Sequence, residues 1–432
     1  MKHFFQFTER NTSYKQETLA GVTTFLSIAY ILVVNPLILS QTGMDKGAIF
    51  TATALTAIIG SLLIGLLANY PIAIAPSMGL NSFFTFSVCI GMGIKWEVAL
   101  TGVFVAGVIF IVLSLLKIRE KIINAIPEDL KHAIAAGIGF FIAFIGFKNA
   151  KIIIPNKDTF VSIGHLTSPT TGLAVFGLVI TILMLVRNVK GAIFYGMIIS
   201  TIIGMLTGLV KIPTHIMGTI PSLKPTFGVV FPHLQDIFAP EVLAVIFTFL
   251  FVAFFDTAGA LIALTSQAGF MKDNKIPKIG RALLADSSAG AIGAILGTST
   301  PATSVESSAG IAVGGRTGFT SVITAVCFAI ALFFSPILSV ITNEVTAPAL
   351  IIVGGLMAMN LQNINWSRVE VAIPSFLTII MMPLTSSVAL GLAFGFILYP
   401  LALLMQKRGK ELHPIMYILA LLFILYFIFI VK

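Results

Sequence analysis

Three acidic residues of this chain lie within apolar stretches, where a carboxylate is costly to place. Asp256 is in the middle of FLFVAFFDTAGALIAL, Asp286 lies in RALLADSSAG, and Glu306 follows the polar segment TSTPATS. A charged side chain at membrane depth costs about 2.5–3.5 kcal/mol on insertion scales, so such residues usually face a cavity and serve a function. We therefore expect Asp256 and Glu306 to form a binding site. Asp286, near one end of its stretch and beside two serines, is expected to be structural.

Both candidate acids also have a structural interpretation. Thr303-Ser304-Val305-Glu306 fits a capping box, in which the glutamate bonds to the backbone at a helix start. Asp256 could be held by Ser and Thr hydroxyl groups for stability alone. A glutamate in the first turn of a half-helix would also be held facing a cavity, so the two interpretations of Glu306 are compatible.

Two carboxylates and one amide could together recognise a flat heterocycle. Carboxylates accept hydrogen bonds from ring or exocyclic N–H groups, and the amide of Asn81 both donates and accepts. A nucleobase offers such an edge. A carboxyl group at membrane depth can also take up a proton, so Glu306 and Asp256 are candidates for proton coupling. We expect no metal or cofactor, because Cys89 and Cys327, the two cysteines, lack metal-ligand spacing.

The composition places most of the chain in lipid. Of its 432 residues, 57% are apolar and 10% are charged, against about 25% charged in a soluble domain. A soluble enzyme is therefore excluded, and we expect no enzymatic activity. With a cytoplasmic N-terminus, eighteen Lys and Arg residues lie in inner segments and seven in outer ones, as the positive-inside rule favours. The net charge of +9 then indicates a cytoplasmic rim facing anionic lipid rather than a nucleic-acid partner.

Apolar runs separated by Gly, Pro, Asn or charged residues predict fourteen spans, seven on each side of a polar, Pro-rich connection. They lie near 18–40, 47–70, 72–91, 97–116, 132–150, 172–187 and 191–210, and near 241–267, 280–297, 301–314, 319–342, 346–360, 369–384 and 386–405. A further apolar stretch, Pro414 to Val431, follows the basic turn KRGKELH. The sequence leaves open whether this stretch crosses the membrane or lies along its surface.

The two sets of seven spans resemble an internal repeat. The tripeptide TFL at 24–26 recurs at 248–250, and Pro76 and Pro301, 225 residues apart, each lie in a polar, small-residue break. Because seven is odd, the second copy must enter the membrane from the opposite side, as in many secondary transporters. The sequence therefore predicts an inverted repeat.

The two breaks are the most informative part of this repeat. Non-helical backbone at membrane depth persists only where protein or a water-filled cavity satisfies it. Each break is expected to be a short extended stretch followed by a half-helix, with the half-helix N-termini converging on the binding site. The alignment on the prolines places Asn81 opposite Glu306. Ordinary loops between full-length helices are the alternative.

Several long strings resemble one known family. FLSIAYILVVNPLIL, APSMGLNSFF, FVAFFDTAGALIAL, TSTPATSVESSAGIAVGGRTG and MPLT resemble the nucleobase–cation symporter-2 superfamily, in its AzgA-like purine permease branch, over essentially the whole chain. The resemblance implies an all-α polytopic membrane protein of about 14 spans in a 7+7 inverted repeat, with two short strands from broken spans 3 and 10. It implies a core domain (1–117 and 240–342), a gate domain (118–211 and 343–405), a connection (212–239) and a C-terminal segment (406–432) of open placement.

The resemblance also implies a function and a site. Asp256 and Glu306 would bind the base and couple it to protons, with backbone around Met78 and Ser304 completing the pocket. Uracil and xanthine carriers usually have glutamate in span 8 and Gly-Glu in span 10, whereas Asp256 and Val305-Glu306 stand here. This difference favours adenine, guanine or hypoxanthine. The histidine found in span 8 of uracil carriers would fall at Ala260, so a proton role for it is lost.

The expected protein is thus a plasma-membrane importer of purine nucleobases that uses proton symport and alternating access. Its partners would be the purine and the bilayer, and the sequence leaves a homodimer open. An anion transporter of the sulfate-permease type shares the architecture. That alternative resembles chains with a soluble C-terminal domain and normally no binding-site glutamate in span 10, whereas only about twenty-five residues follow Met405 here. An intramembrane aspartyl protease would need a motif such as Gly-x-Gly-Asp, and a channel is disfavoured by the inverted repeat.

Overall fold

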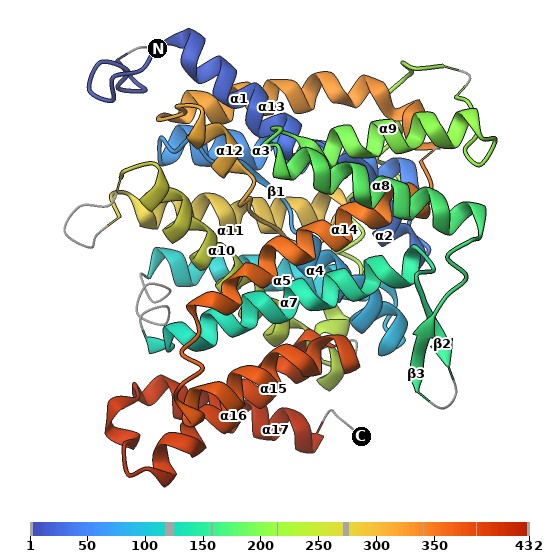
Figure 1. Ribbon diagram of the computed structural model, residues 1–432. Coiled ribbons are helices and arrows are strands. Elements are labelled where there is room, and N and C mark those ends of the chain that lie inside the picture. Colours follow the sequence, from blue (N-terminus) through green and yellow to red (C-terminus); the bar gives the residue numbers. More distant parts are fainter. Residues whose placement is uncertain are drawn as a thin grey trace.

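The fold is built almost entirely of helices, and each predicted span is a helix or a broken helix (Figure 1). The computed structural model describes residues 3–116, 125–156, 159–213, 215–270, 276–339, 341–385 and 387–429. Helices of the first half are α1 (Tyr14–Ile28), α2 (Ile31–Leu39), η1 (Ser40–Thr42), α3 (Lys46–Leu67), α4 (Met78–Ser82), η2 (Phe83–Gly91), α5 (Trp96–Leu115), α7 (Glu128–Asn149), α8 (Pro169–Val186) and α9 (Ala192–Leu206). Those of the second half are η3 (Leu234–Phe238), α10 (Pro240–Gln267), α11 (Ile279–Leu296), α12 (Ser307–Ala312), α13 (Gly318–Ala331), η4 (Leu332–Ser339), α14 (Asn343–Ala358), η5 (Met359–Asn363), α15 (Val369–Thr385), α16 (Val388–Met405), η6 (Gly409–Glu411) and α17 (Pro414–Phe429).

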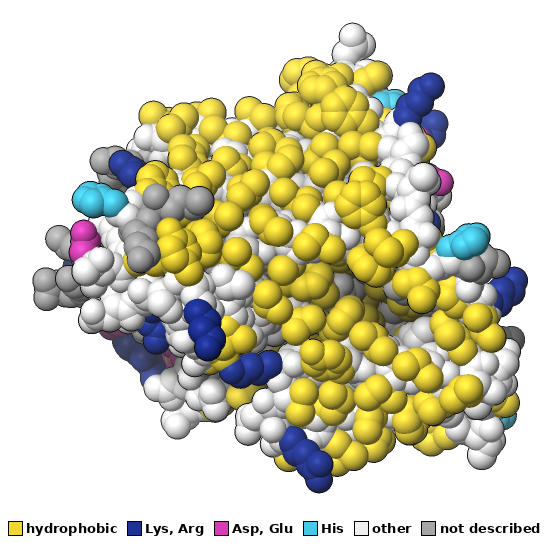
Figure 2. Space-filling view, turned by 90° about the horizontal axis from the view of Figure 1, so that it is seen from above, with side chains coloured by type: hydrophobic (Ala, Val, Ile, Leu, Met, Phe, Trp, Pro, Cys, Tyr) yellow, Lys and Arg dark blue, Asp and Glu magenta, His cyan; other side chains and the backbone are white. Residues whose placement is uncertain are grey.

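The molecule has the dimensions and surface of a membrane protein. In the described part of the chain, eight helices are long and apolar enough to cross a bilayer, and shorter apolar helices accompany them. Hydrophobic side chains cover most of the face in Figure 2, with Lys and Arg lying mainly toward its margin. Because lipid offers no hydrogen bonds, the helical backbone satisfies its own polar groups throughout these segments.

Both predicted breaks are extended stretches followed by short helices. β1 (Ile74–Pro76) leads into α4, and β4 (Pro301–Thr303) leads toward α12. The two strands pair antiparallel, with Pro76 opposite Pro301. Backbone bonds continue the pairing beyond the strands, from Ser77 N–H to the Thr300 carbonyl (3.2 Å) and from Ser304 N–H to the Ala73 carbonyl (2.9 Å). This pairing satisfies backbone groups that would otherwise lie unbonded within the protein.

The strand pair corrects one detail of the predicted repeat. A twofold axis through an antiparallel pair exchanges the start of one strand with the start of the other, so Ile74 corresponds to Pro301 and Pro76 to Thr303. The two prolines face each other across the pair but are not equivalent positions. Asn81 therefore corresponds to Ser308, and the expectation that it stands opposite Glu306 is wrong by two residues.

The long helices form two packed groups. One contains α1, α3, α5, α10, α11, α12 and α13, and the other contains α7, α8, α9, α14, α15 and α16. Glycines allow close contact within each group, since a Cβ on Gly65 of α3 would lie 2.7 Å from the Gly318 carbonyl oxygen of α13. In the second group, a Cβ on Gly139 of α7 would lie 2.7 Å from the Gly354 carbonyl oxygen of α14. Small residues at helix crossings are typical of membrane bundles.

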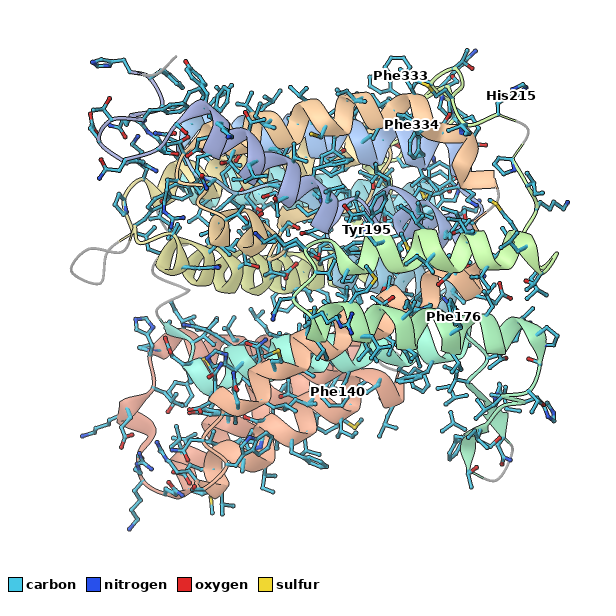
Figure 3. All side chains as sticks on the ribbon, turned by 45° about the horizontal axis from the view of Figure 1, so that its top comes forward. Phe140, Phe176, Tyr195, His215, Phe333 and Phe334 are labelled. Carbon is cyan, nitrogen blue, oxygen red and sulfur yellow. The ribbon has the colours of Figure 1, made fainter. Side chains whose placement is uncertain are left out.

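The connection between the halves lies against the first group. Pro221 accepts a bond from Thr51 Oγ1 of α3 (2.9 Å), and Gly228 N–H donates to Ile295 of α11 (2.8 Å). Figure 3 labels His215 of this connection at the same end of the molecule as Phe333 and Phe334, and Gly218 N–H donates to the Phe333 carbonyl (2.9 Å). The connection is therefore anchored on that group along its length.

Two further features lie outside the predicted plan. A hairpin of β2 (Ile153–Asn156) and β3 (Phe160–Ile163) joins α7 to α8 and was not expected from the sequence. Beyond α16, α17 packs on that helix, and its buried Phe423 stacks on Phe396 with ring centroids 5.4 Å apart. The expected domain boundary at 117/118 and the last residues of the segment 406–432 lie outside the described residues.

Candidate functional site

Asp256 projects from α10 to the first break. Its Oδ2 accepts a hydrogen bond of 2.7 Å from Ser77 Oγ. Ser77 is the N-cap residue of α4, yet its side chain makes no capping bond to that helix. The serine hydroxyl is therefore committed to the acid, and it ties a helix of the second repeat to the break of the first.

Glu306 is held by two hydroxyl groups. Tyr30 Oη donates to Oε1 at 2.6 Å, and Ser304 Oγ donates to Oε2 at 2.6 Å. Tyr30 lies where α1 passes into α2 and is 2% exposed. Both carboxylate oxygens thus have a donor, one from a distant helix and one from the neighbouring backbone turn.

The capping-box interpretation of Glu306 is wrong. A capping box requires the glutamate at the third helical position, but α12 begins at Ser307 and Glu306 is itself the N-cap residue. Its side chain makes no cap bond and turns instead toward Tyr30. The chain enters the helix through a turn in which Ser307 N–H bonds to the Ser304 carbonyl, which delays the helix start by several residues.

The two acids flank the paired strands. Ser77 directly follows β1 and Ser304 directly follows β4. Since the strands are antiparallel, the two serines mark opposite ends of the pair. We call Asp256 with Ser77, and Glu306 with Ser304 and Tyr30, the two acid–hydroxyl clusters.

Met78 and Asn81, two further predicted site residues, are buried in α4, and among the described residues the Asn81 amide is hydrogen-bonded to neither acid. Met78 opens α4 directly after Ser77 and is buried. The Asn81 amide donates to Asn35 Oδ1, and Asn35 Nδ2 donates to Thr53 Oγ1 (2.7 Å) and to Thr298 Oγ1 (3.0 Å). Asn81 therefore joins a fully buried amide network rather than either acid–hydroxyl cluster. Sequence reasoning missed Asn35, whose signal is a lone amide before a proline in ILVVNPLIL.

Asp286, which the sequence predicts to be structural, accepts hydrogen bonds from two threonines. Its Oδ2 accepts from Thr257 Oγ1 (2.8 Å), and its Oδ1 accepts from Thr303 N–H (3.1 Å). These donors are the sequence neighbours of Asp256 and Ser304, so one buried carboxylate links α10 to β4. A cavity of about 10 Å³ beside Asp286 has room for about one water molecule, so it is too small for a nucleobase.

A further buried carboxylate, Glu17 of α1, was missed by sequence reasoning. It is fully buried and accepts bonds from the hydroxyl groups of Thr12 (2.8 Å), Thr317 (2.8 Å) and Thr320 (2.6 Å). The N–H groups of Arg316 (3.0 Å) and Thr317 (3.2 Å) also donate to it. Glu17 therefore fixes the loop between α12 and α13 to α1. Its position seven residues after Arg10, before the apolar run, reads as a loop acid in the sequence.

The first acid–hydroxyl cluster stands where the two helix groups meet. α4 packs on α7, and a Cβ on Gly79 would lie 2.6 Å from Ile138 Cγ2 of α7. α4 also contacts α10 of the first group, so it lies between the two helix groups. A substrate bound near Asp256 would therefore lie close to their boundary.

Comparison with known proteins agrees with the sequence resemblance. The Permease family profile (Xan_ur_permease) matches residues 15–394. The guanine/hypoxanthine permease PbuG of Bacillus subtilis is 55% identical, covering 99% of this chain and 100% of that protein. The adenine permease AdeP of Escherichia coli is 39% identical, covering 100% of this chain and 96% of that protein.

Solved structures show the fold at lower identity. The transmembrane domain of the cyanobacterial bicarbonate transporter BicA superposes with a TM-score of 0.65 at 17% identity, covering 88% of this chain and 97% of that chain. The murine anion transporter Slc26a9 has a TM-score of 0.63 at 11% identity, covering 91% and 69%. These structures share the 7+7 inverted-repeat architecture predicted here. The chain therefore belongs to the Permease family, in the AzgA-like branch of the nucleobase–cation symporter-2 superfamily.

Proposed function

We propose that this protein imports purine nucleobases, namely guanine, hypoxanthine or adenine, across the plasma membrane by proton symport. The observation that carries the proposal is the pair of acid–hydroxyl clusters flanking β1 and β4. The named activities of the relatives PbuG and AdeP supply the substrate class. A carboxylate has lone pairs left beside the bond from its hydroxyl donor, and these can accept the N–H groups of a purine.

The proposal of proton coupling is supported by the lack of a positively charged partner for either acid. Within the described residues, neither Asp256 nor Glu306 forms an ion pair with Lys or Arg. Moving an unpaired carboxylate through the membrane costs desolvation free energy, and moving the neutral, protonated acid costs less. Substrate and proton loading would then be thermodynamically linked, so the loaded site moves more readily than the empty, charged one.

The proposed movement is that of a core domain against a gate domain. The two helix groups support this division, because the first contains both acids and the second presents α7 to the half-helix α4. The core would slide or rock past the gate and expose the site alternately to the two sides of the membrane. The N-terminus would lie in the cytoplasm, as the distribution of basic residues favours.

Liposomes containing the purified protein provide the test. With an inward acid gradient and no sodium, labelled guanine, hypoxanthine or adenine should accumulate, and an uncoupler should abolish the gradient-driven part. Accumulation that survives the uncoupler but requires a sodium gradient would refute proton coupling and leave the purine assignment intact. Uptake of bicarbonate or sulfate without purine uptake would favour an anion transporter of the same fold instead.

A further inference from the structure

Tyr30 connects the second acid–hydroxyl cluster to the opposite repeat. Its bond to Glu306 joins residues 276 positions apart, whereas Ser304 is only two positions from Glu306. Ser304 therefore moves with the glutamate and cannot by itself fix the carboxylate against neighbouring helices. Of the hydrogen bonds that the described part of the chain makes to the Glu306 side chain, the Tyr30 bond alone comes from a distant segment, the junction of α1 and α2.

We infer that Tyr30 is a positioning residue, which holds the Glu306 carboxylate in the orientation that receives the purine. The inference rests on the proposed function. A hydrogen bond to a carboxylate is stronger than one between two neutral groups. A hydrogen bond from the rigid phenol restricts the carboxylate to one rotamer. The side chain is then already ordered before the purine binds, so binding loses less conformational entropy.

The internal repeat allows a tyrosine to be compared with a phenylalanine at the aligned position, and so the role of the hydroxyl group to be distinguished from that of the ring. In the helix segment around the repeated tripeptide TFL, where the offset is 224 residues, Tyr30 aligns with Phe254. Phe254 is buried and stacks on Phe110 with ring centroids 6.5 Å apart. The equivalent site thus packs well without a hydroxyl group. The hydroxyl group is therefore present only in the first repeat, where the tyrosine contacts Glu306.

Tyr70 provides a contrasting buried tyrosine. It is 2% exposed, and its hydroxyl donates to the backbone carbonyl of Pro277 between α10 and α11. A backbone carbonyl suffices to satisfy a tyrosine hydroxyl that has only a structural role. Tyr30 instead donates to an ionisable side chain of the proposed binding site, which a structural role does not require.

The test compares Tyr30→Phe with the matched control Tyr70→Phe in the full-length protein. Initial rates of labelled guanine or hypoxanthine uptake give KM and the maximal rate, and purine-dependent shifts in melting temperature give binding without transport. Tyr30→Phe should raise KM by about tenfold or more with a smaller change in maximal rate, and should reduce the purine-dependent melting shift. Tyr70→Phe should lower the melting temperature at most, with KM changed by less than about twofold.

A second variant keeps the inference testable if Tyr30→Phe does not fold. Tyr30→Leu also removes the hydroxyl group from this buried position, and in the folded protein it should raise KM in the same way. Wild-type KM for a folded Tyr30→Phe or Tyr30→Leu protein overturns the role of Tyr30. Absence of purine uptake by the wild-type protein would instead contradict the proposed function itself.

Discussion

Ser77 and Asp256, 179 residues apart in the chain, are joined by a hydrogen bond of 2.7 Å that crosses between the two repeats. The bond from Tyr30 to Glu306 crosses in the opposite sense. In each case a long helix of one repeat contacts a residue beside the paired strand of the other. Each break is therefore hydrogen-bonded to the other repeat, so a substitution at either acid removes a contact between the two repeats.

Asp256→Asn should abolish purine uptake and leave the protein folded. Asparagine keeps the volume and one acceptor for Ser77, but it cannot carry the negative charge or take up a proton. Uptake of labelled guanine and elution as a single species in size-exclusion chromatography measure the two effects. Asp236→Asn, at a 49% exposed side chain in the connection between the halves, is the control and should transport normally. Wild-type uptake by Asp256→Asn would contradict the site.

Glu306→Gln should lose accumulation driven by the proton gradient. Glutamine keeps an acceptor for Tyr30, but it cannot exchange a proton at neutral pH. Uptake measured at several external pH values, with and without uncoupler, reports the loss. If pH-dependent accumulation persists, the coupling proton is carried elsewhere, with Asp256 the next residue to examine.

Gly354→Ala should destabilise the protein, whereas Gly355→Ala on the same helix should not. A Cβ at Gly354 would lie 2.8 Å from the Ala143 nitrogen of α7, but a Cβ at Gly355 meets no atom within 4 Å. Overpacking of this kind costs about 1–3 kcal/mol, while alanine is the better helix former at an open position. Thermal unfolding in detergent should show a lower midpoint for Gly354→Ala alone. Equal midpoints would mean that α7 and α14 separate at little cost.

Glu17→Ala should be strongly destabilising. The change leaves the hydroxyl groups of Thr317 and Thr320 and two backbone N–H groups without their acceptor. Each buried donor left unsatisfied costs about 1–3 kcal/mol. Glu9→Ala, at an exposed position of the same N-terminal segment, is the control and should change the melting temperature little. A similar melting temperature for both variants would show that the Glu17 bonds contribute no net stability.

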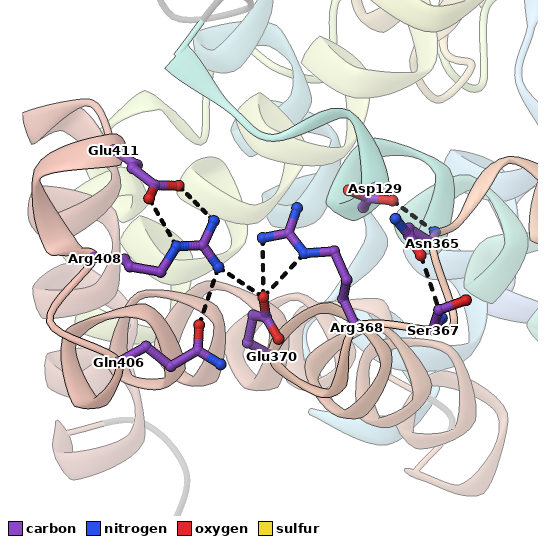
Figure 4. A network of polar contacts seen from close by, with 8 residues as sticks. All are labelled: Asp129, Asn365, Ser367, Arg368, Glu370, Gln406, Arg408 and Glu411. Atoms are coloured by element: carbon purple, nitrogen blue, oxygen red, sulfur yellow. Dashed lines mark hydrogen bonds and ion pairs between the residues drawn. The ribbon is translucent and has the colours of Figure 1, made fainter.

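The exposed pair of Arg408 and Glu411 should lose its contribution to stability in acid (Figure 4). Hydrogen bonds from the Arg408 guanidinium at 2.7 Å hold the pKa of Glu411 below its usual value. A lowered pKa in the folded state means that the contribution is present above the unfolded pKa of about 4.3 and is lost as the pH falls through the folded value. The difference in melting temperature between the wild type and Glu411→Gln should therefore shrink below about pH 4. A difference that is constant from neutral to acidic pH would exclude this ion pair as its source.

The amino-acid sequence alone determined the spans, the breaks and the acids. A helix in lipid satisfies its backbone locally, so long apolar runs predict α3, α5 and α7 without knowledge of their neighbours. The prolines and small polar residues at Pro76 and Pro301 interrupt this local pattern, which is why β1 and β4 were predictable. Asp256 and Glu306 could be identified because a carboxylate in an apolar run is rare, since its desolvation costs free energy.

Only the tertiary structure decided what these side chains contact. The partners Ser77 and Tyr30 lie 179 and 276 residues from their acids, and hydrogen bonds over such separations depend on how helices pack, which local sequence does not encode. Strand register likewise shifted the equivalence of Asn81 by two residues, because pairing is set by backbone bonds between the breaks. Glu17 resembles a solvated loop acid until the loop between α12 and α13 closes over it and its buried carboxylate meets the donors that offset its desolvation.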